Sequence, residues 1–148
     1  MTPVKHLPDQ AFPFLTLPER DRLLARGRQL HFEPGDVVLR EGHESCAIYV
    51  LLCGRVAVEK EHLDESVVLD ELRAGAVFGE VSFLDGSPPS ASIVALEPVD
   101  IFVVDELGDL LVSDPALAAG FYRSLATLVA RRLRFTTQES VRAAASLI

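Results

Sequence analysis

The chain has 148 residues, of which 49% are hydrophobic, and a formal net charge of −8 at pH 7. This combination predicts one globular domain with a single core, excludes a disordered chain, and opposes nonspecific binding to nucleic acid. The sequence has neither an apolar run of the about 18 residues that a membrane span needs nor an apolar signal segment after Met1, so we expect a cytosolic protein that does not enter a membrane.

The first expected element is a helix over residues 17–26, which follows a proline-punctuated segment, residues 1–15. Thr16 and Glu19 match a capping box, in which the threonine oxygen accepts from the third helical amide and the glutamate reaches back. Gly27 is expected to end the helix. We expect one end of the core to be covered by Leu7, Phe12, Phe14 and Leu15, and the buried stripe of the helix to consist of Leu17, Leu23 and Leu24.

Residues 29–104 consist of short segments rich in Val, Ile and Leu, which turn residues interrupt every about 8 to 12 positions. Residues 55–59 alternate apolar and polar side chains, and residues 101–104 are typical of a fully buried strand. Strands of this spacing close on themselves in a jelly roll, which hides most unpaired edges. The predicted fold class is therefore mainly β with flanking helices, a jelly-roll β-roll (double-stranded β-helix) whose interior is the expected place for a ligand.

The jelly-roll prediction raises the alternative of a metal-dependent enzyme, because cupin enzymes share this architecture. A metal site needs several converging His and carboxylate ligands, whereas His31, His43 and His62 are isolated and form no His-x-His pair. We therefore predict no metal ligand and no catalytic residue. Cys46 and Cys53 flank one predicted strand without a CxxC pair, and we interpret them as buried small hydrophobic residues.

Two helices are expected after the strands, within residues 105–145. Residues 105–113 form the short one, and Asp114 and Pro115 then begin the long one as its N-cap and first helical residue. The long helix is predicted to reach about Thr136, with an apolar stripe of Leu117, Phe121, Tyr122, Leu125, Leu128, Val129, Leu133 and Phe135. This wide stripe favours a homodimer through the helix, and packing on its own roll is the alternative. We interpret its basic residues as a solvated face: Arg123, Arg131, Arg132, Arg134 and Arg142.

The segment from Phe78 to Val94 combines a glycine turn, one short helical turn and a Gly/Pro/Ser loop. Gly79 lets the backbone approach a ligand, and the amides that follow it are free to point at an anion. Glu80 is an acid between apolar neighbours and therefore needs a partner. Two interpretations remain open: Glu80 accepts hydrogen bonds from ligand hydroxyls in a small-molecule cradle, or Glu80 caps its own backbone in a structural loop.

The same segment resembles the phosphate-binding cassette of cyclic-nucleotide-binding domains, such as those of the catabolite activator protein and of the regulatory subunits of cyclic-AMP-dependent kinase. Residues 32–42 and 47–58 resemble the first and second hairpins of this family, so the resemblance extends over nearly the whole chain. It implies that backbone amides at Gly79, Glu80 and Val81 hold a cyclic phosphate and that the Glu80 carboxylate binds a ribose hydroxyl. The implied ligand-binding residues are Phe78, Gly79, Glu80, Val81, Pro89, Ser90, Ala91 and Ser92.

The cassette departs from the family pattern at the arginine that neutralises the phosphate. Its position is occupied by Pro89 or, if the loop is one residue longer, by Ser90, and neither residue is cationic. Hydrogen bonds to charged groups contribute about 1.5 to 3 kcal/mol each, so without a replacement cation the affinity for cyclic AMP or cyclic GMP should fall by a factor on the order of 10 to 100. Arg40, Arg55 and Arg73 are the candidates to supply this charge from other strands.

The resemblance implies a non-catalytic regulatory sensor of cyclic AMP, cyclic GMP or another small anionic ligand, in which the C-terminal helix covers the pocket and responds to binding. The alternative function is an interaction or dimerisation module that has lost the ligand. Regulators of this family carry a DNA-reading domain after the long helix, and no such pattern follows here. We therefore expect residues 1–148 to form one domain that does not bind DNA, either a stand-alone sensor or a fragment of a longer regulator.

Overall fold

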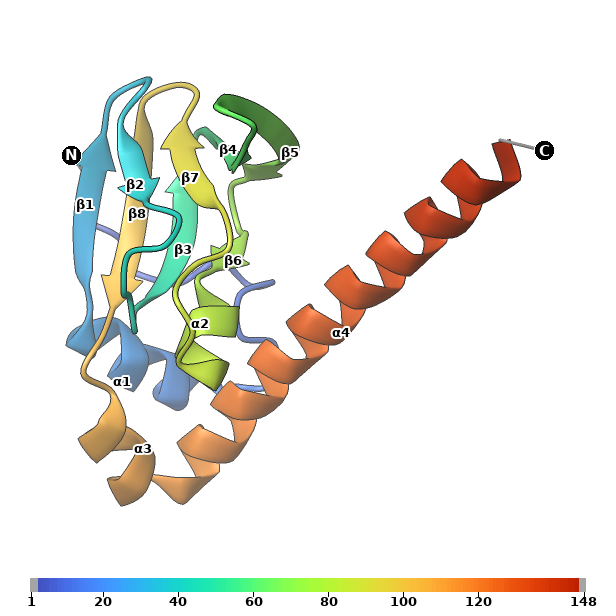
Figure 1. The fold of residues 1–148 in the computed structure, drawn as a ribbon. Coiled ribbons are helices and arrows are strands. Elements are labelled where there is room, and N and C mark those ends of the chain that lie inside the picture. The colour runs from blue at the N-terminus through green and yellow to red at the C-terminus, as the bar shows by residue number, and fades with distance from the viewer. Residues whose placement is uncertain (1–2, 147–148) are drawn as a thin grey trace.

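The computed structural model of the chain describes residues 3–146 and places two antiparallel sheets face to face, with helices at one end of the roll (Figure 1). One sheet has the strand order β1-β8-β3-β6, and the other has the order β2-β7-β4-β5. This arrangement confirms the predicted jelly-roll class. The elements are α1 (Leu17–Arg26), β1 (Arg28–Phe32), β2 (Val37–Leu39), β3 (Ile48–Cys53), β4 (Arg55–His62), β5 (Glu65–Arg73), β6 (Val77–Phe78), α2 (Glu80–Asp85), β7 (Ser92–Ala95), β8 (Val99–Val104), α3 (Gly108–Ser113) and α4 (Pro115–Ser146).

Two groups of buried side chains fill the fold. One lies between the first sheet and the helices, and the fully buried Phe12, Leu23 and Phe121 belong to it. The other lies between the two sheets and includes the fully buried Leu51 and Ile101. Most of the roll interior is therefore occupied by the protein's own side chains, and space for a ligand has to be sought at its edges.

The start of α1 confirms the predicted capping box. The Thr16 hydroxyl accepts from the Glu19 amide at 3.3 Å, and the Thr16 amide donates to the Glu19 carboxylate at 2.9 Å. The buried stripe was predicted wrongly at Leu17, which is 76% exposed, because this first helical residue faces solvent. Gly27 does end the helix, but with extended backbone at φ −104°. A Cβ atom there would lie 2.2 Å from the Phe102 ring, so close packing requires glycine.

The C-terminal helices differ from prediction at the start of the first helix and at the end of the second. The first, α3, begins at Gly108 instead of residue 105, because Glu106 has a φ of +52° that no right-handed helix accommodates. The Asp114 carboxylate accepts from the Leu117 amide at 3.2 Å, which confirms the predicted N-cap of α4. This helix continues to Ser146, ten residues beyond the predicted end.

The apolar stripe of α4 divides into a buried and an exposed part. Leu117, Phe121 and Leu125 are buried in the core, whereas Leu133 is 66% and Phe135 is 61% exposed. Figure 1 shows why: α4 passes α2 and its C-terminal half then projects away from both sheets. None of the helices within residues 3–146, α4 included, combines the length and hydrophobicity that a membrane crossing requires.

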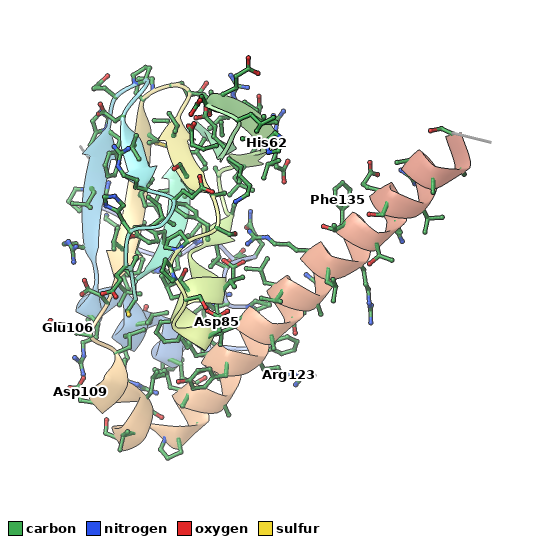
Figure 2. All side chains as sticks on the ribbon, viewed as in Figure 1. His62, Asp85, Glu106, Asp109, Arg123 and Phe135 are labelled. Carbon is green, nitrogen blue, oxygen red and sulfur yellow. The ribbon has the colours of Figure 1, made fainter. Side chains whose placement is uncertain are left out.

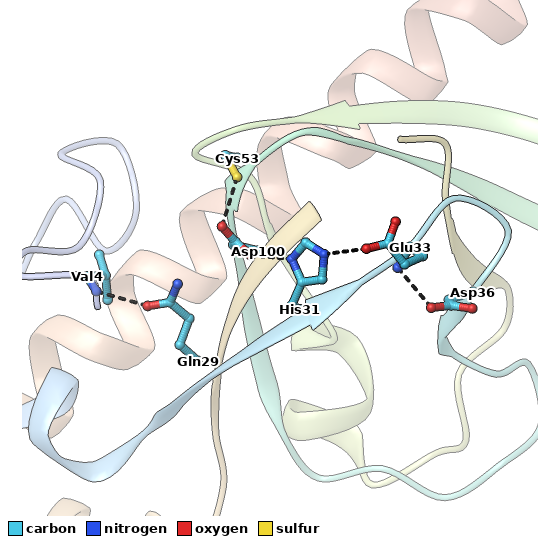
Figure 3. Close-up of polar contacts among 7 residues, drawn as sticks. All are labelled: Val4, Gln29, His31, Glu33, Asp36, Cys53 and Asp100. Carbon is cyan, nitrogen blue, oxygen red and sulfur yellow. Dashed lines mark hydrogen bonds and ion pairs between the residues drawn. The ribbon is translucent and has the colours of Figure 1, made fainter. Parts of the chain in front are cut away.

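Four polar side chains form a chain of contacts on the outer face of the first sheet (Figure 3). His31 Nδ1 lies 2.7 Å from Asp100, its Nε2 lies 2.8 Å from Glu33, and the Cys53 thiol donates to Asp100 at 3.3 Å. The strand register creates this chain, because His31 and Cys53 both pair with Asp100 on β8. The prediction of two buried cysteines was wrong, since Cys46 and Cys53 are both exposed.

The same contacts shift the pKa values of these groups. Carboxylates only accept hydrogen bonds, so both His31 nitrogens donate best when the ring is protonated. The hydrogen bonds to Asp100 and then Glu33 accordingly raise the pKa of His31 above its ordinary 6.5. The bond from His31 lowers the pKa of Asp100. Partial desolvation by neighbouring atoms, followed by the bond to Asp100, raises the pKa of the Cys53 thiol although the residue as a whole is exposed. Cys53 is therefore a weakly acidic thiol with little thiolate at neutral pH.

Candidate functional site

A cavity of about 360 Å³ lies where α2, the loop that follows it, the inner face of the second sheet and α4 meet. We call it the cassette cavity. Among the residues predicted to bind a ligand, those that line it are Phe78, Gly79, Glu80, Val81, Pro89, Ser90 and Ala91. Ser92 does not line it, because its hydroxyl instead accepts from the Glu41 amide at 2.9 Å. Apolar side chains of the second sheet complete the walls: Leu39, Val58, Leu72 and Ile93.

Gly79 sets the geometry of the cassette. It is the N-cap of α2 and has left-handed backbone, with φ of +84° and ψ of 2°. A Cβ atom there would lie 2.8 Å from the Ala47 carbonyl oxygen and 2.9 Å from the Tyr49 ring, which itself stacks on Phe78 at 5.0 Å. Glycine is therefore required for two reasons: the backbone is left-handed, and the packed Tyr49 ring leaves no space for a Cβ atom. The first amides of α2 lack intrahelical partners and receive no side-chain cap from Gly79.

Glu80 is the buried acid of the cavity, at 4% exposure, and its partner comes from the far end of the chain. The Arg132 guanidinium on α4 donates to the Glu80 carboxylate, and it also donates to the Val77 carbonyl oxygen at 2.5 Å. The Arg132 side chain remains 38% exposed, so the ion pair has one buried and one partly solvated member. The contact ties α4 directly to the cassette.

Arg132 was missed by the sequence reasoning, which placed it on a solvated basic face. That interpretation is wrong for this residue, because its guanidinium lies in the cavity wall. A usable signal existed: Phe121, Leu125, Leu128 and Arg132 follow one another at helical spacing, and the first three face the core. The contact itself joins residues 52 positions apart, which no local pattern reveals.

The other arginines considered as replacement cations do not line this cavity. Arg55 is bound to Glu71 at 3.1 Å and to Glu97 at 3.3 Å. Arg40 and Arg73 are exposed and absent from the cavity wall. Within residues 3–146, Arg132 is therefore the only cationic side chain that lines the cassette cavity.

The positions of the missing cassette arginine differ in their surroundings. Pro89 is buried, and its carbonyl oxygen accepts from the Gly42 amide at 2.9 Å. Ser90 is exposed, and its carbonyl oxygen accepts from Lys60 Nζ at 2.8 Å. The loop is thus held by contacts to the connection after β2 and to β4, and Ser90 is the position at which a longer side chain has room.

Negatively charged groups outnumber positively charged ones in the wall of the cassette cavity. Three carboxylates, those of Asp70, Glu80 and Asp85, face one guanidinium, that of Arg132. Asp85 lies at the C-terminal end of α2 (Figure 2), where it accepts from the Ser87 amide at 2.8 Å. Any phosphate placed in this cavity would therefore depend on Arg132 and on the α2 amides for favourable electrostatic contacts.

Known proteins resemble this chain in sequence and in fold. The sequence pattern of the cyclic nucleotide-binding domain matches residues 29–108, more than half of the chain. Cyclic GMP-binding protein C of Dictyostelium discoideum is 32% identical over 123 residues, which are 80% of this chain and 5% of that protein. The cyclic AMP receptor protein of Thermus thermophilus is 31% identical over 119 residues, which are 78% of this chain and 53% of that protein.

The chain thus spans about half, or much less, of the length of these curated relatives. The solved structure of a cyclic nucleotide-binding domain from Methylobacillus flagellatus superposes with a TM-score of 0.83 at 24% identity, over 91% of this chain and 83% of that one, and has the same fold. The strand order, the cassette segment and the matched residues together lead to one conclusion: this chain belongs to the cyclic nucleotide-binding domain family.

Proposed function

We propose that the domain is a non-catalytic regulatory sensor that binds cyclic AMP or cyclic GMP in the cassette cavity and reports binding through α4. Membership of a family of regulatory cyclic-nucleotide-binding domains supports this proposal, as do relatives named for binding cyclic GMP and cyclic AMP. The observation that carries it is the contact between Arg132 of α4 and the buried Glu80. This contact gives one side chain access to both the ligand space and the helix that would respond.

Each part of the cassette has a role in this proposal. The amides of Gly79, the N-cap of α2, and of Glu80 and Val81 in its first turn would donate to the cyclic phosphate, and Glu80 would accept from ribose hydroxyls. Arg132 would supply the positive charge that Pro89 and Ser90 do not provide. Pro89, Ser90 and Ala91 would form the outer rim of the site, and Phe78 its floor.

The ion pair explains how a ligand would act on α4. Ribose hydroxyls and the Arg132 guanidinium compete for the same Glu80 carboxylate, so binding exchanges one hydrogen-bond partner for another. The released guanidinium is then free to pair with the ligand phosphate, a short movement within the same cavity. A ligand shifts a conformational equilibrium only by binding one state better, and the two partners of Arg132 provide that difference.

Isothermal titration calorimetry tests this function with cyclic AMP, cyclic GMP and a cyclic dinucleotide. We expect saturable heat with a cyclic mononucleotide, and Arg132→Gln should weaken this binding about 10-fold or more because a charge-assisted hydrogen bond is lost. Arg134→Gln is the matched control. Arg134 is an exposed arginine of α4 that does not line this cavity and forms no ion pair within residues 3–146. Absence of heat with all three ligands would favour the alternative, a module that has lost its ligand.

The exposed half of α4 supports a second part of the proposal, a homodimer. Leu133, Phe135 and Val141 are each more than 60% exposed, and Phe135 stands on the part of the helix that extends beyond the roll (Figure 2). Pairing with the same helix of a second copy would bury the face that Leu133 and Val141 share, and fully burying one such side chain contributes about 1.5 to 3 kcal/mol. The resulting helix pair would connect the two cassettes.

Sedimentation equilibrium measures this association. Leu133→Lys should shift the protein toward monomer, whereas Val112→Lys on α3, where the side chain is 82% exposed, should leave the association unchanged. Equal behaviour of the two variants, or a monomeric wild type at all concentrations, argues against the α4 dimer. A stable dimer that binds no cyclic nucleotide supports the dimerisation module as the function.

A further inference from the structure

A second cavity, of about 440 Å³, lies beside α4 between the N-terminal segment and the turn that joins β5 to β6. We call it the arginine cavity. Gln10 and Phe12 line it from one side, residues 71–77 from the second, and one face of α4 within residues 124–132 from the third. It shares only Leu72 and Arg132 with the cassette cavity, so the two are neighbouring but distinct spaces.

The arginine cavity carries the opposite charge to the cassette cavity. Arg73, Arg131 and Arg132 line it, and the single acid in its wall, Glu71, is already bound to Arg55 at 3.1 Å. Arg132 is engaged by Glu80, but neither Arg73 nor Arg131 has an ion-pair partner among residues 3–146. In a chain with a formal charge of −8, two unpaired guanidiniums facing one hollow are an unusual concentration of positive charge.

Polar groups with spare hydrogen-bonding capacity stand beside these guanidiniums. The Thr127 hydroxyl has no hydrogen bond within the described part of the chain, and the Gln10 amide nitrogen makes one long bond, to the Ala74 carbonyl oxygen at 3.5 Å. Thr127 and Arg131 lie four positions apart on α4, so they present their polar ends from one helix face. The apolar walls include Phe12, Leu125 and Leu128, which limit solvent screening within the hollow.

We propose that the arginine cavity is a second ligand site, which binds an anion with two or more negative charges, such as the phosphate group of a small metabolite. Arg73 at the end of β5 and Arg131 from α4 pair with the anion, and Thr127 donates to it. Guanidinium groups suit this task because they form bidentate, charge-assisted hydrogen bonds to phosphate oxygens. The inference does not depend on the cassette function, because it uses different residues.

Nuclear magnetic resonance of the 15N-labelled protein, titrated with inorganic phosphate against sodium chloride at equal ionic strength, tests the proposal. We expect saturable amide shifts at residues 73–77 and 127–131 with phosphate, which chloride does not reproduce. Arg73→Gln and Arg131→Gln should each weaken binding about 10-fold, because each removes a charge-assisted pair. Both arginines are exposed, so neither variant should unfold the protein, and the amide spectrum reports this directly.

Arg134→Gln is the matched control and should bind phosphate as tightly as the wild type. If phosphate shifts only the amide signals of residues 79–82, the anion binds in the cassette cavity and the proposal is overturned. Shifts that never saturate, that chloride reproduces, or that Arg134→Gln weakens as much as Arg131→Gln does would show only general ionic attraction and would equally overturn it. A failure to bind cyclic nucleotide leaves these outcomes unaffected, so the two proposals stand or fall separately.

Discussion

Replacing Arg132 by glutamine removes the cation that faces the buried Glu80 while keeping a long polar side chain on α4. A lone carboxylate at 4% exposure is costly, and breaking a fully buried ion pair destabilises proteins by about 3 to 5 kcal/mol. Exposed pairs contribute only about 0 to 1 kcal/mol. Because the Arg132 side chain is 38% exposed, solvent screens the pair, and we expect a loss of about 1 to 3 kcal/mol in the free energy of unfolding.

Urea denaturation and thermal melting, without added ligand, measure this loss. For a chain of this size, each kcal/mol lowers Tm by about 2 to 4 °C, so Arg132→Gln should melt several degrees below the wild type. Arg134→Gln should stay within about 0.5 kcal/mol. A double-mutant cycle with Glu80→Gln should give a coupling energy of about 1 to 2 kcal/mol. If Arg132→Gln is as stable as Arg134→Gln and the cycle shows no coupling, the ion pair does not hold α4 on the cassette.

The remaining predictions concern the cassette turn, its missing cation and the outer face of the roll. Gly79→Ala should destabilise the protein more than Gly86→Ala, because both have positive φ but only Gly79 also meets packed atoms; equal losses in urea melts would contradict the packing argument. Ser90→Arg should tighten cyclic-nucleotide binding about 10-fold by calorimetry, and no gain would mean that the cavity has diverged by more than one charge. Asp100→Asn should lower the pKa of His31 toward 6.5 in an NMR titration, because the first cause of its raised pKa is removed. The stability that wild-type His31 contributes relative to His31→Gln is complete below pH 6.5 and disappears as the pH rises through the raised pKa; a constant difference across that window would refute the linkage.

The fold could be predicted because its signals are local. The capping box at Thr16 and Glu19 lies within four residues, and the N-cap at Asp114 acts on an amide three residues away. Such motifs depend on hydrogen bonds between residues that are neighbours in the sequence, so a local sequence pattern is enough to predict them. The jelly-roll class followed from the regular spacing of short strands and turns, which tertiary contacts do not alter.

The cassette cavity was predictable for a related reason. Most of its predicted residues belong to one continuous segment, from Phe78 to Ala91, and the glycine turn at its start fixes the direction of the backbone. Ser92 fell outside the cavity because the strand alternation at β7 turns its hydroxyl toward Glu41.

The errors arose where the outcome depends on which surfaces the tertiary structure covers. Leu17 and Cys53 fit apolar patterns, yet both are exposed, because periodicity shows a face and not whether another element packs on it. The prediction for Arg132 was wrong in the opposite direction. Its charge indicated a solvent-exposed side chain, but Arg132 lies about two helical turns after the buried Leu125 and therefore faces the cassette. The arginine cavity required three distant segments to meet, so sequence reasoning could not have found it.

A crystal structure of the protein grown with saturating cyclic AMP or cyclic GMP tests the central claim most directly. The account predicts ligand density in the cassette cavity, with ribose hydroxyls on Glu80, phosphate oxygens on the α2 amides, and the Arg132 guanidinium moved from Glu80 to the phosphate. A cavity that remains empty at saturating nucleotide, with Arg132 still bound to Glu80, would contradict it.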